Sequence, residues 1–301
     1  MVVAGVEAGA PGIGPEQLID SHHHLWDLQR HVYRWLEGGG DSATTAWIGD
    51  YSSIRQPYLI DDYLSEASRC GVRKSVHVEA LWGGADSVEE TRWLQTISDQ
   101  YGLPQAIVVA VDLCAPDAED QLDRHVASPN VRGVRMAQMG DLATREDFRR
   151  GFAALAERGL SYDINIKLEH ATHALGLADA FPGTTLLVDN MANPTTLDGE
   201  YLARWKTAMR MLAQAPNVVM KISGLGMADH SWTVEKIRPW VLAAFEIFSP
   251  GRCMFGSNWP VDRLYGSYES LVDTLRSITA ELSVDERQAF FSGTAERCYR
   301  I

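Results

Sequence analysis

The sequence predicts a single-domain (β/α)8 barrel, the TIM-barrel fold. Eight short apolar segments, rich in β-branched residues, alternate with longer amphipathic segments along the 301-residue chain. Strands that are buried on both faces have this composition. No Pro-, Gly- or Ser-rich linker divides the chain, and 301 residues is an ordinary length for one barrel. A doubly wound open sheet is the alternative that the same alternation allows.

The predicted strands and helices follow one another in pairs. We expect strands at residues 18–26, 74–80, 106–113, 131–137, 161–167, 185–190, 218–224 and 253–260. We expect helices at residues 61–69, 87–100, 117–126, 145–158, 170–180, 201–215, 234–248, 268–282 and 285–299. Asp86 or Ser87 can cap the second of these helices. Gly71 and Gly159 follow two other helices, as C-terminal caps do.

The beginning of the chain differs in composition from the rest. Residues 1–16 are rich in Gly, Ala and Pro, and we expect a flexible N-terminal arm there, with the barrel spanning 17–301. The arm has neither the basic region nor the apolar run of a signal peptide, and no stretch of the chain reaches the length of a membrane-spanning helix.

Charge and cysteine usage narrow the class of protein. The net charge of −13 argues against nucleic acid or an anionic membrane as a partner, because both require a basic surface. We therefore expect a small-molecule substrate, with a homodimer as the candidate assembly. The four cysteines are scattered and form no CxxC pair, which predicts reduced thiols and a cytoplasmic location.

Polar residues gather where the predicted strands end, which is where TIM barrels keep their reactive groups. The stretch DSHHHLWD (20–27) ends the first strand. Because residues i and i+2 of a strand face the same side, His22 and His24 can both face the barrel mouth, with His23 turned away. Two imidazoles on one face suit a divalent transition metal. The alternative is that both histidines only hydrogen-bond and support other groups.

Several stretches carry a family resemblance. They are LIDSHHHLWD (18–27), SVHVEAL (75–81) with EETRWL (89–94), VRGVRMA (131–137), VVMKISGLGM (218–227) and RCMFGSNWPVD (252–262). With them the chain resembles the amidohydrolase superfamily, in particular the amidohydrolase 2 branch of sugar lactonases and pyrone-dicarboxylate lactonase. The resemblance implies a barrel, a site with one metal ion or none, and hydrolysis of a lactone or similar carbonyl compound.

The resemblance also implies roles for particular residues. His22 and His24 match the first-strand histidine pair, and Arg135 matches an arginine that grips a substrate carboxylate, a task suited to the guanidinium fork. Pairing of Arg135 with a structural acid is the alternative. Two positions depart from the family pattern: Asn190 stands where relatives commonly have His, and Asn258 where many have the Asp that activates water. An asparagine cannot accept that proton.

Other residues are candidates for the missing functions. Glu79 can complete a His22, His24 and Glu79 metal set or act as the base, and Asp262 follows the eighth strand closely enough to be a second candidate base. The candidates for substrate binding, apart from Arg135, are His77, Lys167, His170, Asn190 and Lys221. For each of them a purely structural role is the alternative.

Three tryptophans, Trp26, Trp82 and Trp259, follow predicted strands one, two and eight. They can wall an apolar pocket around a cyclic substrate, or they can simply pack between loops. The sequence has no GxGxxG after a strand, no GxxxxGK[ST] and no GxSxG, so nucleotide binding and serine-hydrolase chemistry are not expected.

Three functions remain open from the sequence. The first is a lactone hydrolase in which one zinc or manganese ion, at His22, His24 and Glu79, polarises the carbonyl while Lys221 and Asn258 orient the substrate; a metal-free site is the variant of this hypothesis. The second is a decarboxylase, another lyase or an isomerase with the same site. The third is a non-enzymatic binder of a small molecule, since a fold alone does not determine function.

Overall fold

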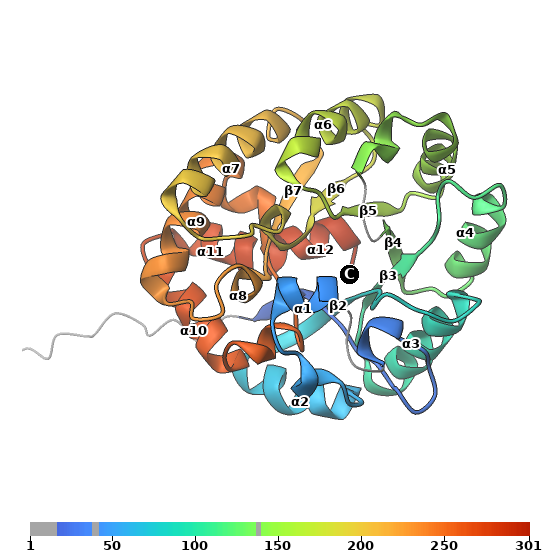
Figure 1. Ribbon diagram of the computed structural model, residues 1–301, viewed down its shortest axis with the longest axis horizontal. Helices are drawn as coiled ribbons and strands as arrows, with labels where there is room; N and C mark the ends of the chain where they lie inside the picture. Colours follow the sequence, from blue (N-terminus) through green and yellow to red (C-terminus); the bar gives the residue numbers. More distant parts are fainter. Residues whose placement is uncertain (1–16, 38–41, 137–139) are drawn as a thin grey trace, which may run out of the picture.

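The structure is a computed structural model that describes residues 17–37, 42–136 and 140–301. Its eight strands form one parallel sheet in the order β1 to β8, and helices surround this sheet (Figure 1). The strands are β1 (Leu18–His23), β2 (Val72–Val78), β3 (Ala106–Ala110), β4 (Val131–Met136), β5 (Ser161–Ile164), β6 (Leu186–Val188), β7 (Val218–Ile222) and β8 (Cys253–Phe255). The predicted arm at 1–16 lies outside the described residues.

The residues that follow β8 pair with the end of β1 and close the sheet into a barrel. The backbone N–H of Asn258 donates to the carbonyl of His22, and that of His24 to the carbonyl of Trp259, each at 2.7 Å. The strand order is sequential throughout, whereas a doubly wound sheet would change direction midway. The prediction of a (β/α)8 barrel is confirmed, and the open-sheet alternative is wrong.

The predicted helices are present with shifted ends. They are α2 (Ile60–Ala67), α3 (Val88–Tyr101), α4 (Ala118–Val126), α5 (Glu146–Glu157), α6 (Ala171–Ala180), α7 (Gly199–Leu212), α9 (Val234–Phe248), α10 (Tyr268–Ile278), α11 (Val284–Gln288) and α12 (Thr294–Tyr299). A π-helical segment, Ala289–Gly293, joins α11 to α12 within the final predicted helix. Two short helices, α1 (Ser42–Ile48) and α8 (Leu225–Ala228), were not predicted. Within the described residues no helix is long and apolar enough to cross a membrane.

Helix ends follow the local sequence signals in part. Gly71 and Gly159 end their helices in the left-handed conformation, with φ of 95° and 63°, as expected for C-terminal caps. At the start of α3, Asp86 accepts a hydrogen bond from the backbone of Val88 at 3.1 Å. The Ser87 hydroxyl instead donates to the carbonyl of Ala110 at 2.9 Å, so it ties α3 to β3 rather than capping the helix.

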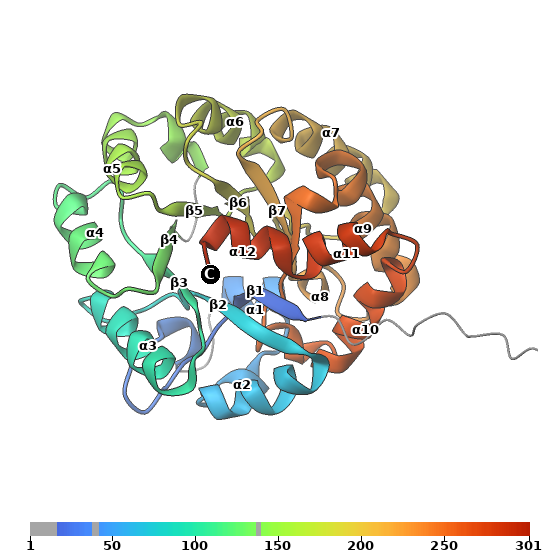
Figure 2. The same cartoon turned by 180° about the vertical axis from the view of Figure 1, so that it is seen from behind.

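The interior of the barrel is apolar at one end and polar at the other. Ile19, Val76 and Val108 belong to one buried cluster with Tyr299 of α12, and α12 lies across that end of the barrel (Figure 2). Burial of these side chains stabilises the barrel and closes its N-terminal end. The charged side chains that face the interior therefore lie further along the strands, toward their C-terminal ends.

Candidate active site

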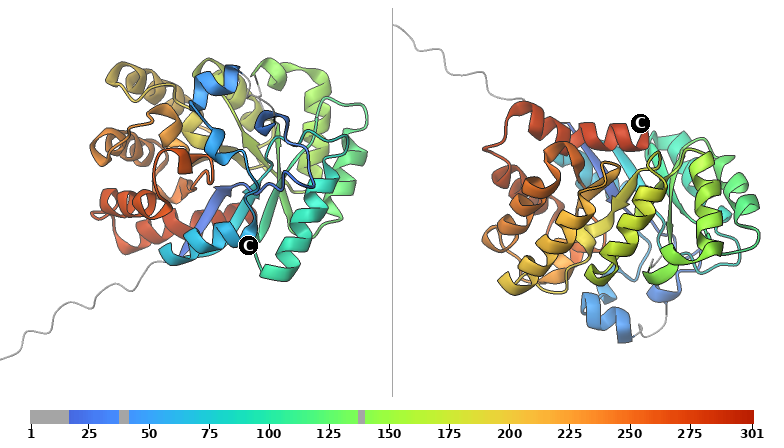
Figure 3. Two further views of the ribbon diagram at one scale, coloured as in Figure 1. Left: turned by 60° about the horizontal axis from the view of Figure 1, so that its bottom comes forward. Right: turned by 90° about the horizontal axis from the view of Figure 1, so that it is seen from above.

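A cavity of about 730 Å³ opens at the C-terminal ends of the strands. Its inner part is lined by buried polar side chains from the strand ends: His24, Arg135, Asn190 and Asn258. Helix α1 contributes Trp47 to the outer wall, and it lies on the side of the barrel opposite α12 (Figure 3). The cavity therefore occupies the face at which TIM-barrel enzymes place their reactive groups.

His22 and His24 lie side by side at the end of β1, with ring centroids 5.0 Å apart. The Nδ1 atom of His24 is 2.8 Å from the carbonyl oxygen of Val78, so Nδ1 carries the proton. The Nδ1 atom of His22 is 3.3 Å from Asp189 Oδ1, and its buried Nε2 has no hydrogen-bond partner within the described residues. Burial lowers the pKa of His22 to about 4 and that of His24 well below its usual value. Both imidazoles are therefore neutral at pH 7 and offer an Nε2 lone pair.

His23 faces away from the cavity, as the alternation along a strand predicts. Its ring stacks on Tyr63 of α2 with centroids 4.1 Å apart, and its Nε2 lies 3.0 Å from the Ser75 hydroxyl. His23 therefore connects β1 to β2 and to α2, on the outer side of the barrel wall.

Asp20 holds the end of β8 in place, a role that the sequence did not suggest. Its carboxylate accepts hydrogen bonds from Tyr63 at 3.0 Å and Tyr268 at 2.9 Å. It also accepts from the backbone and the hydroxyl of Ser257, at 2.8 and 2.6 Å. Because Asn258 follows directly, these bonds determine where its amide enters the cavity. The one sequence signal for this role was an acidic residue directly after the apolar pair Leu18 and Ile19, within a buried strand.

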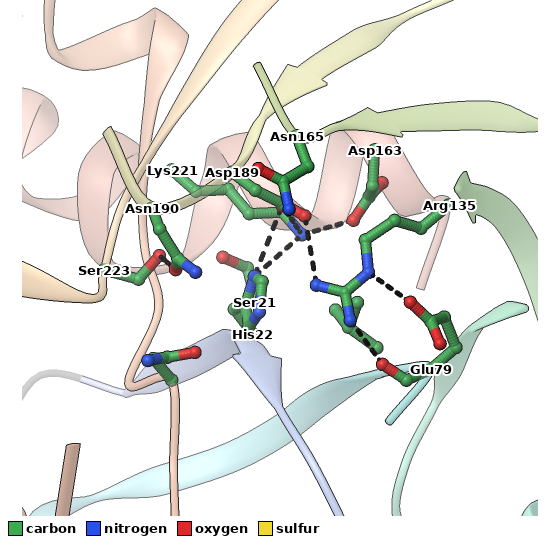
Figure 4. Close-up of polar contacts among 12 residues, drawn as sticks. Ser21, His22, Glu79, Arg135, Asp163, Asn165, Asp189, Asn190, Lys221 and Ser223 are labelled. Carbon is green, nitrogen blue, oxygen red and sulfur yellow. Dashed lines mark hydrogen bonds and ion pairs between the residues drawn. The ribbon is translucent and has the colours of Figure 1, made fainter. Parts of the chain in front are cut away.

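A cluster of buried charges lies beneath the cavity (Figure 4). Lys221 of β7 is fully buried and pairs with Asp163 and, at 3.0 Å, with Asp189. The Tyr299 hydroxyl donates to Asp163 at 2.9 Å. Burial raises the pKa of Asp163 to about 6. Burial also acts on Asp189, but the charge of Lys221 and the contact with His22 outweigh it and hold the pKa of Asp189 well below its usual value.

Lys221 was predicted as a substrate ligand from the sequence, and Asp163 was not among the predicted site residues. The structure encloses Lys221 among carboxylates, and Lys221 does not line the cavity. Asp163 lies within the short strand SYDI, whose four residues are all buried, and a charged residue inside a predicted buried strand is the signal that was available. A charge buried there is costly unless a partner compensates it, and the interior position of Lys221 supplies one.

Glu79 pairs with Arg135 instead of joining the two histidines. Arg135 Nε donates to Glu79 Oε1 at 2.7 Å, and a guanidinium Nη2 donates to the backbone carbonyl of the same residue. The second carboxylate oxygen of Glu79 accepts the backbone N–H of Leu81 at 2.7 Å. Within the described residues, no group of three or more His, Cys, Asp or Glu side chains is placed to hold a metal ion. The predicted set of His22, His24 and Glu79 is therefore not brought together.

Asn190 and Asn258 project into the cavity from an unusual backbone conformation. Their φ angles are 46° and 56°, and residues 190–193 all have positive φ. Asparagine tolerates this left-handed region better than most residues, yet such a run stores strain, which often marks a functional site. The Asn190 amide oxygen accepts the Ser223 hydroxyl at 2.6 Å. Gly224 is required nearby, because a Cβ there would come within 2.7 Å of the Asn190 side chain.

Asp262 lies behind Asn258 and does not line the cavity. Its Oδ1 is buried without a hydrogen-bond partner in the described part of the chain. Burial raises the pKa of Asp262 to about 7, although the Asn258 side chain and the backbone of Gly226 and Gly224 act in the opposite direction.

The shifted pKa of Asp262 predicts how its replacement changes stability with pH. Because the folded pKa of about 7 lies above the usual pKa of 3.8 for an aspartate, the stability that protonation provides is complete below about pH 4 and is lost as the pH rises through 7. Asp262→Asn should therefore raise the free energy of unfolding in urea at pH 8 by up to about 4 kcal/mol over wild type, and by much less at pH 5. Exposed Asp179→Asn is the control. An equal effect of Asp262→Asn at both pH values would contradict the assignment.

The remaining predicted residues divide into two groups. Lys167 and His170 do line the cavity. His77 does not; its Nε2 accepts the backbone N–H of Leu25 at 2.9 Å, because the side chain points outward from β2. It therefore holds the segment that follows β1.

The predicted tryptophan wall is wrong for the described residues. Trp26 donates to the carbonyl of Gln56 at 2.8 Å, and Trp259 donates to Glu66 at 3.1 Å; both are buried away from the cavity. Trp82 packs on His31. Trp26, Trp82 and Trp259 therefore pack between loops. The tryptophans that line the cavity are Trp35 and Trp47.

The fold and the site together define a TIM barrel with its candidate reactive groups at the C-terminal face. The chain belongs to the amidohydrolase family, whose model Amidohydro_2 matches residues 19–301. It is 38% identical to an uncharacterised protein of Sinorhizobium fredii, over 94% of this chain and 98% of that protein. It is 30% identical to an L-fucono-1,5-lactonase of Burkholderia multivorans, over 94% of this chain and 96% of the lactonase.

Solved structures agree with this family membership. An amidohydrolase structure from Burkholderia multivorans with bound zinc is 29% identical in sequence, with a TM-score of 0.79, and covers 95% of this chain and 99% of that chain. The shared barrel therefore extends over nearly the whole length of both proteins.

Proposed function

We propose that this protein hydrolyses a lactone or a similar cyclic ester. The observation that carries the proposal is the pair of neutral imidazoles: His24 lines the inner part of a cavity that also presents the Arg135 guanidinium, and His22 lies buried beside His24. Relatives named L-fucono-1,5-lactonase support the same class of reaction. A lyase or isomerase reaction, and binding without catalysis, are the alternatives that the experiment below separates from hydrolysis.

The two imidazoles fit a divalent metal ion, and Glu79 does not. Each Nδ1 already faces a carboxylate or carbonyl oxygen, as in metal-bound histidines, and the buried Nε2 of His22 has no partner in the described structure. Both oxygens of Glu79 are occupied by Arg135 and the backbone of Leu81. His22 and His24 would therefore hold a zinc or manganese ion, which supplies Lewis-acid polarisation of a carbonyl.

The other inner residues orient the ester. Arg135 lines the cavity and is buried, while Glu79 and Asp189 compensate its charge. It therefore acts as a positioned hydrogen-bond donor to the ring or carbonyl oxygen of the substrate. The amides of Asn190 and Asn258, which the strained backbone holds in place, are further donors for the oxygen that gains charge.

Removal of a proton from the attacking water needs a base other than Asn258. In a metal-free site, the Nε2 lone pairs of His22 and His24 serve this purpose. Asp262, whose pKa burial raises to about 7, lies behind Asn258 and does not line the cavity, so it is a weaker candidate than the two imidazoles. A cytoplasmic location is also part of the proposal, and the four free cysteines support it.

Hydrolysis in ¹⁸O-labelled water tests the proposed reaction. With L-fucono-1,5-lactone and simple δ- and γ-lactones as substrates, we expect release of acid and one ¹⁸O atom in the product carboxylate. Release of carbon dioxide, or a rearranged product without label, would indicate a lyase or an isomerase. Tight binding without turnover of any substrate would indicate a binding protein.

Metal content is measured on the same untagged preparation, purified without chelator. One equivalent of zinc or manganese, lost in a His22→Ala and His24→Ala double variant, would support a metal held by the two histidines. Full activity after exhaustive chelation would assign the two imidazoles to proton transfer instead.

A further inference from the structure

The outer part of the cavity differs chemically from the inner part. We define the outer part by its more exposed lining residues: Trp35, Trp47, Leu81, Lys167, Tyr201 and Arg204. Trp47 and Leu81 are each 43% exposed, although both are large and apolar. Apolar side chains that remain exposed inside a cavity are typical of a surface that a ligand covers.

Leu81 is held in this exposed position at an energetic cost. Its φ is 59°, in the left-handed region that a leucine rarely adopts. Its backbone N–H donates to Glu79, the same carboxylate that pairs with Arg135. The hydrogen bond to Glu79 thus offsets the backbone strain at Leu81. Because Glu79 also orients Arg135, the same carboxylate connects the outer and inner parts of the cavity.

The positive charges of the cavity are ion-paired in the inner part, whereas in the outer part of the described structure they form no ion pair. Inside, Arg135 faces Glu79 and Asp189, and Lys221 is enclosed by Asp163 and Asp189. In the outer part, the side chains of Lys167 and Arg204 form no ion pair or hydrogen bond within the described residues. An anionic group of a ligand would therefore pair with Lys167 and Arg204 at the outer end of the cavity, and not with Arg135.

The two outer cations lie on neighbouring elements. Lys167 immediately precedes the short 3-10 helix Leu168–His170, which packs against α7, the helix that carries Arg204. The Arg204 guanidinium lies 5.6 Å from the ring of Tyr201, so an aromatic face adjoins the charge. The acidic residues nearby are Glu169, which also lines the cavity, and Asp198, whose pKa Arg204 helps to lower.

Resting on the proposed function, we propose that the substrate is an amphiphilic lactone. Its lactone ring occupies the inner part, an apolar and preferably aromatic body lies against Trp47, Leu81 and Tyr201, and an anionic group at the far end meets Lys167 and Arg204. The cavity volume of about 730 Å³ lies within the range of about 300–1,000 Å³ typical of pockets that enclose drug-sized ligands.

Three lactones with the same ring test this assignment: δ-valerolactone, its phenyl derivative and its para-carboxyphenyl derivative. We expect kcat/KM to rise in that order, about tenfold for the phenyl group and about three- to fivefold more for the carboxylate. A para-phosphonophenyl derivative distinguishes the kind of anion, since a further gain over the carboxylate would indicate a phosphate-bearing substrate. Equal kcat/KM for all four lactones would overturn the proposal while leaving lactone hydrolysis intact.

Variants assign the effects to residues. Arg204→Ala should abolish the preference for the carboxyphenyl over the phenyl lactone, through KM, and Arg204→Lys should restore part of it. Arg210→Ala, on the same helix but paired with Glu246 and outside the cavity, should keep the full preference. Trp47→Ala should reduce the gain that the phenyl group provides. A carboxylate preference that survives in Arg204→Ala and in Lys167→Ala would overturn the assigned anion site.

Binding of para-phenylbenzoate, which cannot be hydrolysed, separates this inference from the proposed function. If none of the lactones is opened, the proposed function fails. The amphiphilic site then still predicts calorimetric binding of para-phenylbenzoate to the wild type, with affinity about three- to fivefold lower in Arg204→Ala. Absence of binding in the wild type would overturn the inference as well.

Discussion

Replacing His22 with alanine is expected to lower kcat/KM for the best lactone substrate by about 10³-fold. The substitution removes a buried Nε2 lone pair that has no partner in the described structure, together with the contact of Nδ1 with Asp189. Loss of a positioned acid–base group typically costs about 10²–10⁴-fold in rate. His24→Ala should have a similar effect, because His24 lines the cavity directly. The measurement is steady-state kinetics on variants whose circular dichroism matches wild type.

His23 provides the matched control for this experiment. It is the adjacent histidine and is equally buried, but its ring stacks on Tyr63 outside the cavity. His23→Gln retains a side chain that can reach Ser75, and we expect it to change stability more than kcat/KM. If His22→Ala retained full activity, or if His23→Gln lost as much activity as His22→Ala, the two first-strand histidines would not have the assigned role.

Replacing Lys221 with methionine is expected to lower the free energy of unfolding by about 3–5 kcal/mol, the usual cost of removing one partner from a buried ion pair. Lys221 is fully buried, and its loss leaves Asp163 and Asp189 close together without the cation between them. Methionine has similar length, so packing is largely retained and the change is mainly one of charge. Urea unfolding at pH 7 measures the difference.

Two comparisons separate charge from packing in the Lys221 experiment. Lys206→Met makes the same change at a partly exposed lysine whose ion pair with Glu246 spans 3.8 Å, and it should cost less than about 1 kcal/mol. Adding Asp163→Asn to Lys221→Met should recover part of the lost stability, because it removes one uncompensated carboxylate. A double variant less stable than Lys221→Met would contradict the charge explanation.

At the strand ends, some side-chain directions could be predicted from the sequence and others could not. His22 and His24 lie together and His23 lies apart, as the i, i+2 alternation predicted, although β1 ends at His23 and its pairing with β2 is irregular between Asp20 and His23. The same reasoning failed for Glu79, because β2 ends at Val78 and the chain turns there. Once a strand has ended, alternation no longer determines the direction of a side chain, and Glu79 turned to Arg135.

The tryptophans and the ion cluster illustrate a second limit. Trp26 and Trp259 follow strands at the cavity end, but contacts with Gln56 and Glu66 hold them between loops. Those partners lie 30 and 193 residues away in the chain, so no local pattern could identify them. Asp163 of β5 and Lys221 of β7 are 58 residues apart in the chain. They are neighbours because both side chains point into the barrel interior.

By itself, the sequence determined the barrel, the order of its elements and the histidine pair on the first strand. These follow from local periodicity: apolar runs that strands bury, amphipathic runs that helices bury, and alternation along a strand. Only the tertiary structure decided that Glu79 neutralises Arg135, that Lys221 is enclosed by carboxylates, and that Lys167 and Arg204 line the outer cavity without an ion pair to any described residue. The physical reason is that the energy of a buried charge depends on which residues lie within a few ångströms, and the closure of the barrel determines those neighbours.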